Sequence, residues 1–177
     1  MLGPLDVHRW LLERSVPHEM VQLRRGLVSD DDLPDVLGLP PEQCAVVRVL
    51  AVDGHDSSAG TSAVAFVAAL VPAGTWPSPS LLAAALGVVS LRRATSAETS
   101  AATDFAATLT SPVGLPGGIQ LLVDSGLTRQ SVIYAATGAP RVALGIRTAD
   151  LLAASGTTPV DLAPGRLAAD GSLPVPA

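Results

Sequence analysis

The sequence of 177 residues contains no lysine, because all eleven of its basic residues are arginines. The missing amine excludes Schiff-base chemistry, amine nucleophiles and a lysine general base of lowered pKa. The net charge of −5 argues against a general nucleic-acid binder, which would carry a basic face. Contact with one end of an RNA remains compatible with this charge, whereas binding to DNA is not expected.

Aromatic residues and cysteine are also scarce. Only five residues are aromatic although 48% of the chain is hydrophobic, so the core must be built from Ala, Val and Leu. The single cysteine, Cys44, excludes an internal disulfide and a cysteine-based zinc site, and its place in an apparent strand predicts a small buried apolar residue. The apolar runs are too short to span a membrane, and the N-terminus lacks a signal-peptide pattern. We therefore expect a cytoplasmic protein with no membrane partner.

Length and composition predict one domain over residues 1–165, followed by a poorly ordered tail over 166–177. Helical spacing, caps and stops predict helices at 6–15, 29–38, 78–87, 96–105 and 148–155. Ser29 and Thr148 are the expected N-caps of the second and the last of these helices. Short apolar runs between turns predict strands at 18–23, 44–53, 62–72, 90–94, 119–124, 131–137 and 141–146. Because the strands come in consecutive runs, the pattern favours a mixed α+β domain.

Three short motifs could suggest chemistry, and a structural interpretation is favoured for each. The stretch "DGHDSS" at 53–58 has the composition of a solvated hairpin turn, and no second cluster with metal-ligand spacing accompanies it. Ser125 in "VDSG" lacks the surrounding pattern of a serine hydrolase and fits a strand-ending turn. "GLPGG" at 114–118 matches neither a phosphate loop nor a dinucleotide fingerprint. No metal or cofactor is therefore expected.

The order of several longer motifs carries a family resemblance. "LGLPPEQ" at 37–43, "SPVGLP" at 111–116, "LLVD" at 121–124 followed by "VIYAATG" at 132–138, and "ADLLAASG" at 149–156 occur in this order. In order and spacing together they resemble the YbaK/ProX aminoacyl-tRNA editing family. Its members are freestanding deacylases or domains inserted in prolyl-tRNA synthetase. The resemblance covers roughly residues 6–163.

This resemblance implies a barrel-like mixed sheet flanked by helices. It also implies a pocket that accepts the aminoacylated 3′ end of tRNA and hydrolyses the ester of a mischarged amino acid, with an aminoacyl-tRNA synthetase as a further partner. A second hydrolytic sieve is useful because one pocket discriminates only modestly between small amino acids. In the family, a lysine, a Gly-x-x-x-Pro loop and backbone amides hold the ester and a water, with help from the ribose hydroxyl of the tRNA.

The chain departs from the family pattern at the positions that bear this chemistry. Val46 stands where the family carries its lysine, and Thr108 stands where the loop would have its glycine. Val113 replaces the phenylalanine or leucine that follows the loop proline. Ala136 replaces a typical serine, and Ala143 falls near a position that is often polar. The scaffold of the family is thus kept, while several polar pocket positions are apolar.

Arg48 is the one charged residue in the predicted strand over 44–53. Side chains alternate along a strand, so Arg48 points to the same side as Val46, about 6.5–7 Å away. Its guanidinium cannot act as a base, but it could bind a phosphate or carboxylate or stabilise an oxyanion. Alternatively, Arg48 pairs structurally with an acid such as Asp104 or Asp124, or emerges at a sheet edge.

Two functions from different classes follow, with a third left open. The first is a trans-editing deacylase in which Arg48 supplies the missing charge, backbone amides from Thr110 to Gly114 and near Gly138 polarise the ester, and hydroxyl groups position a water. The second is a catalytically silent paralogue that binds tRNA ends, a small ligand or a protein partner. The third is a hydrolase of a small ester or amide. The expected catalytic residues are Arg48, Thr110, Ser111 and Gly114, and the expected substrate-binding residues are Val46, Thr108, Pro112, Ala136, Thr137 and Gly138.

Overall fold

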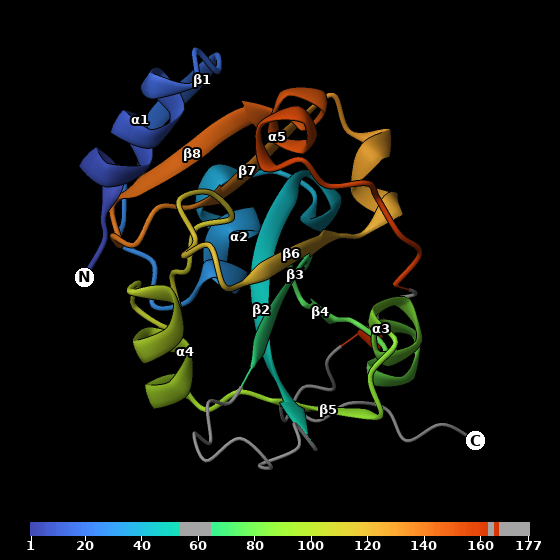
Figure 1. Cartoon of the computed structure of the whole chain (residues 1–177). Coiled ribbons are helices and arrows are strands. Elements are labelled where there is room, and N and C mark those ends of the chain that lie inside the picture. The colour runs from blue at the N-terminus through green and yellow to red at the C-terminus, as the bar shows by residue number, and fades with distance from the viewer. Residues whose placement is uncertain (54–64, 163–164, 167–177) are drawn as a thin grey trace.

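The computed structural model describes residues 1–53, 65–162 and 165–166 (Figure 1). The larger helices are α1 (Pro4–Glu13), α2 (Leu33–Leu37), α3 (Pro79–Leu86), α4 (Ser96–Thr103) and α5 (Thr148–Ser155). The strands are β1 (His18–Gln22), β2 (Cys44–Asp53), β3 (Phe66–Pro72), β4 (Thr75–Trp76), β5 (Ser90–Arg93), β6 (Gln120–Val123), β7 (Val132–Ala136), β8 (Val142–Arg147) and β9 (Gly165–Arg166). Short 3-10 turns cover Asp30–Asp32, Pro41–Gln43 and Ser125–Arg129.

The main sheet has seven strands in the order β1-β8-β7-β2-β3-β6, and β5 also pairs with β2. Most neighbours are antiparallel, whereas β7 with β2 and β3 with β6 are parallel. The β2–β7 pairing is short, with only Cys44 opposite Tyr134 and Ala45 opposite Ala135. The sheet is mixed and flanked by helices, as the resemblance implies, but it is not closed, since β1 and β6 end the order of strands. The expectation of a barrel-like sheet is corrected to an open one.

Two apolar clusters lie on opposite sides of β2, because its side chains alternate. Ala45, Val47 and Val49 belong to the first cluster, which also holds side chains of α1 and α5. Cys44, Val46 and Leu50 belong to the second cluster, which holds Leu33 of α2 and Leu82 of α3. In Figure 1, α1 and α5 lie in the upper part of the view, α2 lies behind β2, and α3 lies at the lower right.

Local signals in the sequence explain most element boundaries. The Ser29 hydroxyl accepts a hydrogen bond from the Asp31 amide, and Gly38 ends α2 with a left-handed φ of 68°. The expected cap of α5 was wrong by one residue: Arg147 is the N-cap, and the Thr148 hydroxyl donates to the Gln130 carbonyl at 2.6 Å. The "DGHDSS" motif beyond Asp53 and the tail beyond Arg166 lie outside the described residues.

Two further expectations concern the thiol of Cys44 and the ability of the helices to cross a membrane. Cys44 is fully buried, as its place in a strand predicted, and this burial raises the pKa of its thiol to about 12. None of the described helices combines the length and the apolar character that crossing a membrane requires.

Candidate functional site

The positions where the family carries pocket residues gather in the second apolar cluster. Val46, Ala136 and Ala143 are each at most 1% exposed and pack there together with Leu109. Leu109 belongs to the loop that the resemblance singled out, so this loop and β2 do meet on one side of the sheet. In this structure the apolar side chains fill that region by contact with one another. No polar side chain replaces the family lysine at position 46.

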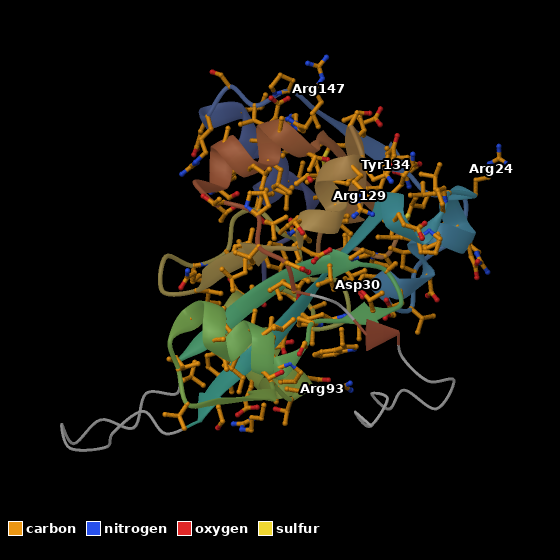
Figure 2. All side chains as sticks on the ribbon, turned by 90° about the vertical axis from the view of Figure 1, so that its right-hand side faces the viewer. Arg24, Asp30, Arg93, Arg129, Tyr134 and Arg147 are labelled. Carbon is orange, nitrogen blue, oxygen red and sulfur yellow. The ribbon has the colours of Figure 1, made fainter. Side chains whose placement is uncertain are left out.

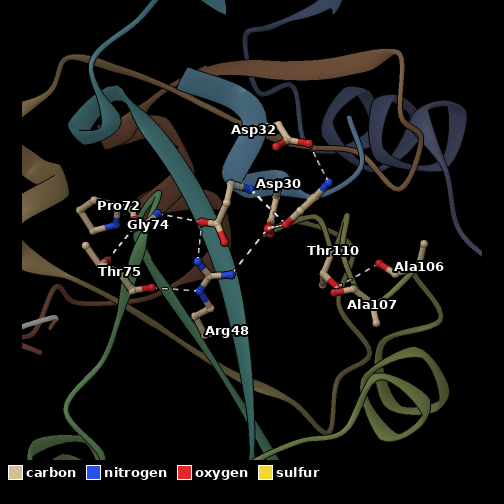
Figure 3. Close-up of polar contacts among 11 residues, drawn as sticks. Asp30, Asp32, Arg48, Pro72, Gly74, Thr75, Ala106, Ala107 and Thr110 are labelled. Atoms are coloured by element: carbon tan, nitrogen blue, oxygen red, sulfur yellow. Dashed lines mark hydrogen bonds and ion pairs between the residues drawn. The ribbon is translucent and has the colours of Figure 1, made fainter. Parts of the chain in front are cut away.

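Arg48 lies on the same side of β2 and is only 7% exposed. Its Nε donates to the carbonyl oxygen of Thr75 at 3.0 Å, and its Nη2 donates to Asp31 Oδ1 at 2.6 Å. Its Nη1 lies 3.6 Å from Asp30 Oδ1. Figure 3 shows the guanidinium enclosed by these groups. The acids that balance Arg48 are therefore Asp30 and Asp31.

The partners named from the sequence, Asp104 and Asp124, are engaged elsewhere. Asp104 forms an ion pair with the amino terminus at 3.0 Å. Asp124 accepts hydrogen bonds from the amides of Gly126 and Leu162. The expectation of a structural acid for Arg48 stands, but the choice of acid was wrong, because the aspartates after Ser29 were assigned only to a helix start.

A capping arrangement holds these aspartates in place. The Asp32 carboxylate accepts hydrogen bonds from the amides of Val28 and Ser29, which fixes the turn. This turn directs Asp30 and Asp31 toward β2, and Asp31 Oδ1 also accepts from the Gly74 amide at 2.7 Å. Of the three consecutive acids, Asp32 therefore caps the turn, whereas Asp30 and Asp31 form ion pairs with Arg48.

Asp30 is 2% exposed, and burial is the main reason that its pKa is raised to about 7. Arg48 opposes this shift and the neighbouring Asp31 adds to it. One cation cannot balance two carboxylates in a buried place, so the more deeply buried acid favours its protonated form. Figure 2 shows Asp30 within the molecule, whereas Arg24 and Arg147 project from its periphery.

An aromatic ring adjoins the same cluster. Trp76 of β4 lies 5.0 Å from the guanidinium carbon of Arg48 and 4.0 Å from that of Arg93. Desolvation and the charge of Arg48 lower the pKa of Arg93. The ring thus contacts both cations, which stabilises each through its π-face. No local pattern in the sequence predicts this contact, because it brings together Trp76 of β4 and Arg93 of β5 only in the folded chain.

The first two residues of the loop from Thr108 to Gly114 are held by backbone hydrogen bonds. The Thr108 carbonyl accepts from the Asp30 amide at 2.8 Å, and the Leu109 carbonyl accepts from the Gly138 amide at 2.9 Å. Thr108 itself is exposed. The loop therefore connects the Arg48 cluster with the end of β7.

The hydroxyl groups predicted to position a water mostly serve the backbone. The Thr110 hydroxyl lies 3.4 Å from the carbonyls of Ala106 and Ala107, and the Thr137 hydroxyl donates to the Val142 carbonyl at 2.7 Å. Ser111 is fully buried, and its oxygen accepts from the Val113 amide at 3.3 Å. These groups shape the loop and the strand end.

The remaining residues predicted for the site lie in two separate parts of the structure. Pro112 and Gly114 line a cleft of about 600 Å³ together with Val113. Val113 belongs to the first apolar cluster, so this cleft lies on the face opposite to Arg48. Gly138 has φ 88°, and an added Cβ would lie 2.6 Å from the Leu2 carbonyl oxygen. The structure thus brings Val46 and Ala136 together, but it separates Arg48 from Pro112 and Gly114.

No metal-binding group is evident in the part of the chain that the structure describes. There, no three residues among His, Cys, Asp and Glu are arranged so as to hold a metal ion. The consecutive acids Asp30, Asp31 and Asp32 are instead occupied by Arg48 and by backbone amides.

Comparison with solved structures supports the fold. One is the crystal structure of a "putative trans-editing enzyme for prolyl tRNA synthetase", with a TM-score of 0.70 and 23% identity over 92% of this chain and 98% of the other. Another is that of the "hypothetical protein APE2540", with a TM-score of 0.75 and 20% identity over 89% of this chain and 98% of the other. At these identities the likeness shows a shared fold. Among curated protein sequences, none matches the chain.

Family comparison gives the more specific result. The family model described as the aminoacyl-tRNA editing domain matches residues 29–154. This range begins at the Ser29 turn, includes β2 and the loop from Thr108 to Gly114, and ends in α5. The family model matches most of the sequence, and the fold is similar to that of the solved structures above. The chain belongs to the aminoacyl-tRNA editing domain family.

Proposed function

We propose that the protein acts in trans on the aminoacylated 3′ end of tRNA and hydrolyses the ester of a mischarged amino acid, as a divergent member of the YbaK/ProX branch. The observation that carries the proposal is the loop from Thr108 to Gly114. Its first two residues bond to Asp30 and to Gly138, and Leu109 belongs to the same apolar cluster as Val46 and Ala136. These contacts support a backbone frame for the ester, although the side chains around it have changed.

The chemistry available to this frame is limited to backbone groups and the substrate itself. The amides of Val113 and Gly138 are engaged by Ser111 and Leu109. The amides that we propose for the ester carbonyl are those of Thr110, Ser111 and Gly114. Two or three such donors can stabilise an oxyanion without any side-chain acid or base. A water then has to supply the nucleophile, and a ribose hydroxyl of the tRNA can orient it. The water adds to the ester carbonyl, the bond to the ribose oxygen breaks, and that oxygen takes up the proton.

Arg48 takes a structural role in this proposal. Its charge is balanced by Asp30 and Asp31, and it is nearly buried. Contact with a substrate phosphate would require breaking the 2.6 Å bond to Asp31 and leaving that carboxylate without its partner. Arg48 therefore orders the turn before α2 against β2 and acts on the loop through the Asp30 amide.

A second candidate is a catalytically silent paralogue that binds tRNA ends without hydrolysis. The specific observation in its favour is the apolar packing of Val46, Ala136 and Ala143. This packing leaves no ionisable side chain at the positions where the family has polar groups. In either case the net charge of −5 gives little attraction to tRNA, so delivery by an aminoacyl-tRNA synthetase in the cytoplasm is part of the proposal.

The deciding experiment is deacylation of a panel of mischarged tRNAs, including alanyl- and cysteinyl-tRNA-Pro. Hydrolysis above the buffer rate is expected for at least one member, and it should be lost when the terminal adenosine lacks its 2′-hydroxyl. Arg48→Met serves as the matched variant and should alter stability more than the rate per folded molecule. If no member is hydrolysed but a tRNA carrying a non-hydrolysable aminoacyl amide still binds, the silent paralogue is the correct interpretation.

A further inference from the structure

The cleft of about 600 Å³ on the face opposite to Arg48 is bordered by four segments. They are the end of α1 with its C-cap Arg14, the loop from Pro112 to Leu115, the first residues of β6, and the end of α5 with the chain that follows it, from Ala154 to Thr158. None of the residues that line this cleft is acidic. Its floor is formed by Gln120, Leu121 and Leu122 of β6. The editing chemistry proposed above uses none of this floor.

The floor is the outer edge of the sheet. In the described part of the chain β6 is the last strand of the order and pairs only with β3. The Asp124 amide donates to the Leu70 carbonyl on the β3 side. Backbone groups alternate along a strand, so Leu122 also faces β3, whereas Leu121 and Val123 direct their N–H and C=O groups outward. The outward groups of Leu121 therefore face the cleft.

A short strand partner already uses the next outward groups. The Val160 amide donates to the Val123 carbonyl at 2.9 Å, and the Ser125 amide donates to the Val160 carbonyl at 2.8 Å. This is the hydrogen-bond pattern of a parallel strand, and it is limited to a single bridge. The chain before Val160 turns away to α5, since the Thr157 amide donates to Leu152. Among the described residues, the N–H and C=O of Leu121, which lines the cleft, are thus left beside an unfilled strand position.

The residues that line the cleft favour a ligand with an apolar side chain and a negative charge. Trp10, Leu115 and Ile119 are partly buried apolar residues that pack on the first cluster. Arg14 stacks over Trp10, with its guanidinium carbon 4.0 Å from the ring, and its Nη1 lies 3.9 Å from the exposed carboxylate of Glu13, which is not part of the lining. An exposed ion pair of this kind contributes little, so Arg14 can exchange Glu13 for a carboxylate that enters the cleft.

We propose that this cleft binds an extended peptide segment of a partner protein, which adds a short strand to the free edge of β6. An apolar side chain of the peptide packs against Trp10, Leu115 and Ile119, and an acidic group pairs with Arg14. The cleft shares the loop residues Pro112 to Gly114 with the proposed editing frame, but peptide binding depends on the edge of β6, so deacylation and peptide titration test the two proposals separately.

Other occupants fit the cleft less well. A second copy would have to bring its own β6 edge into a recess that α1 and α5 border, whereas a single extended chain is thin enough to enter. A single-stranded RNA end would meet one cation in the lining, although its backbone carries a charge at each nucleotide. The unpaired amide and carbonyl groups of the edge specifically match a peptide backbone.

The test is a titration of the ¹⁵N-labelled protein with the peptide acetyl-Thr-Val-Thr-Leu-Asp-amide at millimolar concentrations, followed by NMR. Signals of the Trp10 indole, Leu121 and Thr157 are expected to shift, whereas signals of β1 and β8 stay in place. Two further peptides carry N-methyl groups on Val and Leu or on both Thr residues. A strand uses one edge, so one methylated peptide should lose at least ten-fold in affinity while the other keeps binding.

The charge requirement has its own controls. Arg14→Gln should weaken the acidic peptide about five-fold and leave its Asn analogue unchanged, as expected for one exposed ion pair. Arg147→Gln, an exposed arginine on β8, should change neither. The proposal is overturned if the peptides cause no shifts, if both methylated peptides bind like the parent, or if the trinucleotide CCA and not the peptides shifts the cleft signals.

Discussion

Replacing Asp30 by asparagine tests the buried cluster around Arg48. The folded-state pKa of Asp30 is raised to about 7 from 3.8, chiefly by burial. Between these two values the folded protein holds a proton that the unfolded chain has lost, so stability falls as the pH rises through this window. The contribution is fully present below about pH 3.8 and is lost as the pH rises through about 7.

The magnitude follows from linkage. Each pKa unit corresponds to about 1.36 kcal/mol, and the dependence flattens near the folded-state pKa of about 7, so protonation of this one group changes the free energy of unfolding by about 2.3 kcal/mol between pH 5 and pH 7. Asparagine is neutral at every pH, and its side-chain oxygen can still accept the hydrogen bond from the Ser29 hydroxyl, which is 3.2 Å long in the wild type. The variant should therefore match the wild type near pH 5 and be the more stable protein at pH 8.

The assay is urea unfolding of both proteins at pH 5, 6, 7 and 8, with the difference between them as the measured quantity. Contributions from other titrating groups are common to both proteins and cancel in that difference. Asp35→Asn, at an exposed acid in α2, is the matched control and should run parallel to the wild type. If Asp30→Asn also ran parallel, the protonated buried acid inferred from the geometry would be wrong.

Three further predictions concern other parts of the cluster and the core. Arg48→Met leaves Asp31 and Asp30 without their cation and should lower the free energy of unfolding at pH 8 by about 3–5 kcal/mol, measured in urea; a change below 1 kcal/mol would show that the ion pairs contribute little. Gly138→Ala should lower the free energy of unfolding by at least about 1–3 kcal/mol, because φ is 88° and the new Cβ would lie 2.6 Å from the Leu2 carbonyl oxygen. The matched variant Gly117→Ala, where the added Cβ has open space, should be nearly neutral. Cys44 should resist iodoacetamide in the native protein at pH 8 and react after denaturation, as mass spectrometry would show, because it is buried and its pKa is raised to about 12; rapid labelling of the folded protein would contradict the packing of β2.

The elements with strong local signals could be predicted from the sequence. Ser29, Gly38 and Gly87 marked helix ends because capping and left-handed turns depend on a few neighbouring residues. The two-residue strands β4 and β9 could not be found, since their pairing joins Thr75 and Trp76 to a segment 90 positions later in the chain. The open edge of the sheet was missed for the same reason, because closure depends on long-range register.

The sequence allowed us to predict which polar side chains the candidate site lacks, but not which side chains contact one another there. The loss of the lysine at position 46 could be inferred from the motif order, and the structure adds that Val46 packs with Ala136 and Ala143. The partners of Arg48 could not be chosen by strand geometry, because several aspartates were available and only the folded turn after Ser29 selects Asp30 and Asp31. A run of acidic residues at a helix start can cap the helix or form an ion pair with a buried arginine. Both interpretations have to be considered when a lone arginine occupies a strand.

The short parallel contact between β2 and β7 has a consequence for how the molecule opens. Only two strand pairings join the block of β1, β8 and β7 to the block of β2, β3 and β6, although both apolar clusters extend across this seam, whereas β2 and β3 share seven pairings. Amide hydrogen exchange at this seam should follow partial separation of the blocks and not global unfolding. Since β1 belongs to the block built mostly from the end of the chain, that block can form only after nearly the whole described domain has been synthesised. The two halves of the sheet would then be distinct cooperative units, with the seam at Cys44 and Ala45 as their hinge.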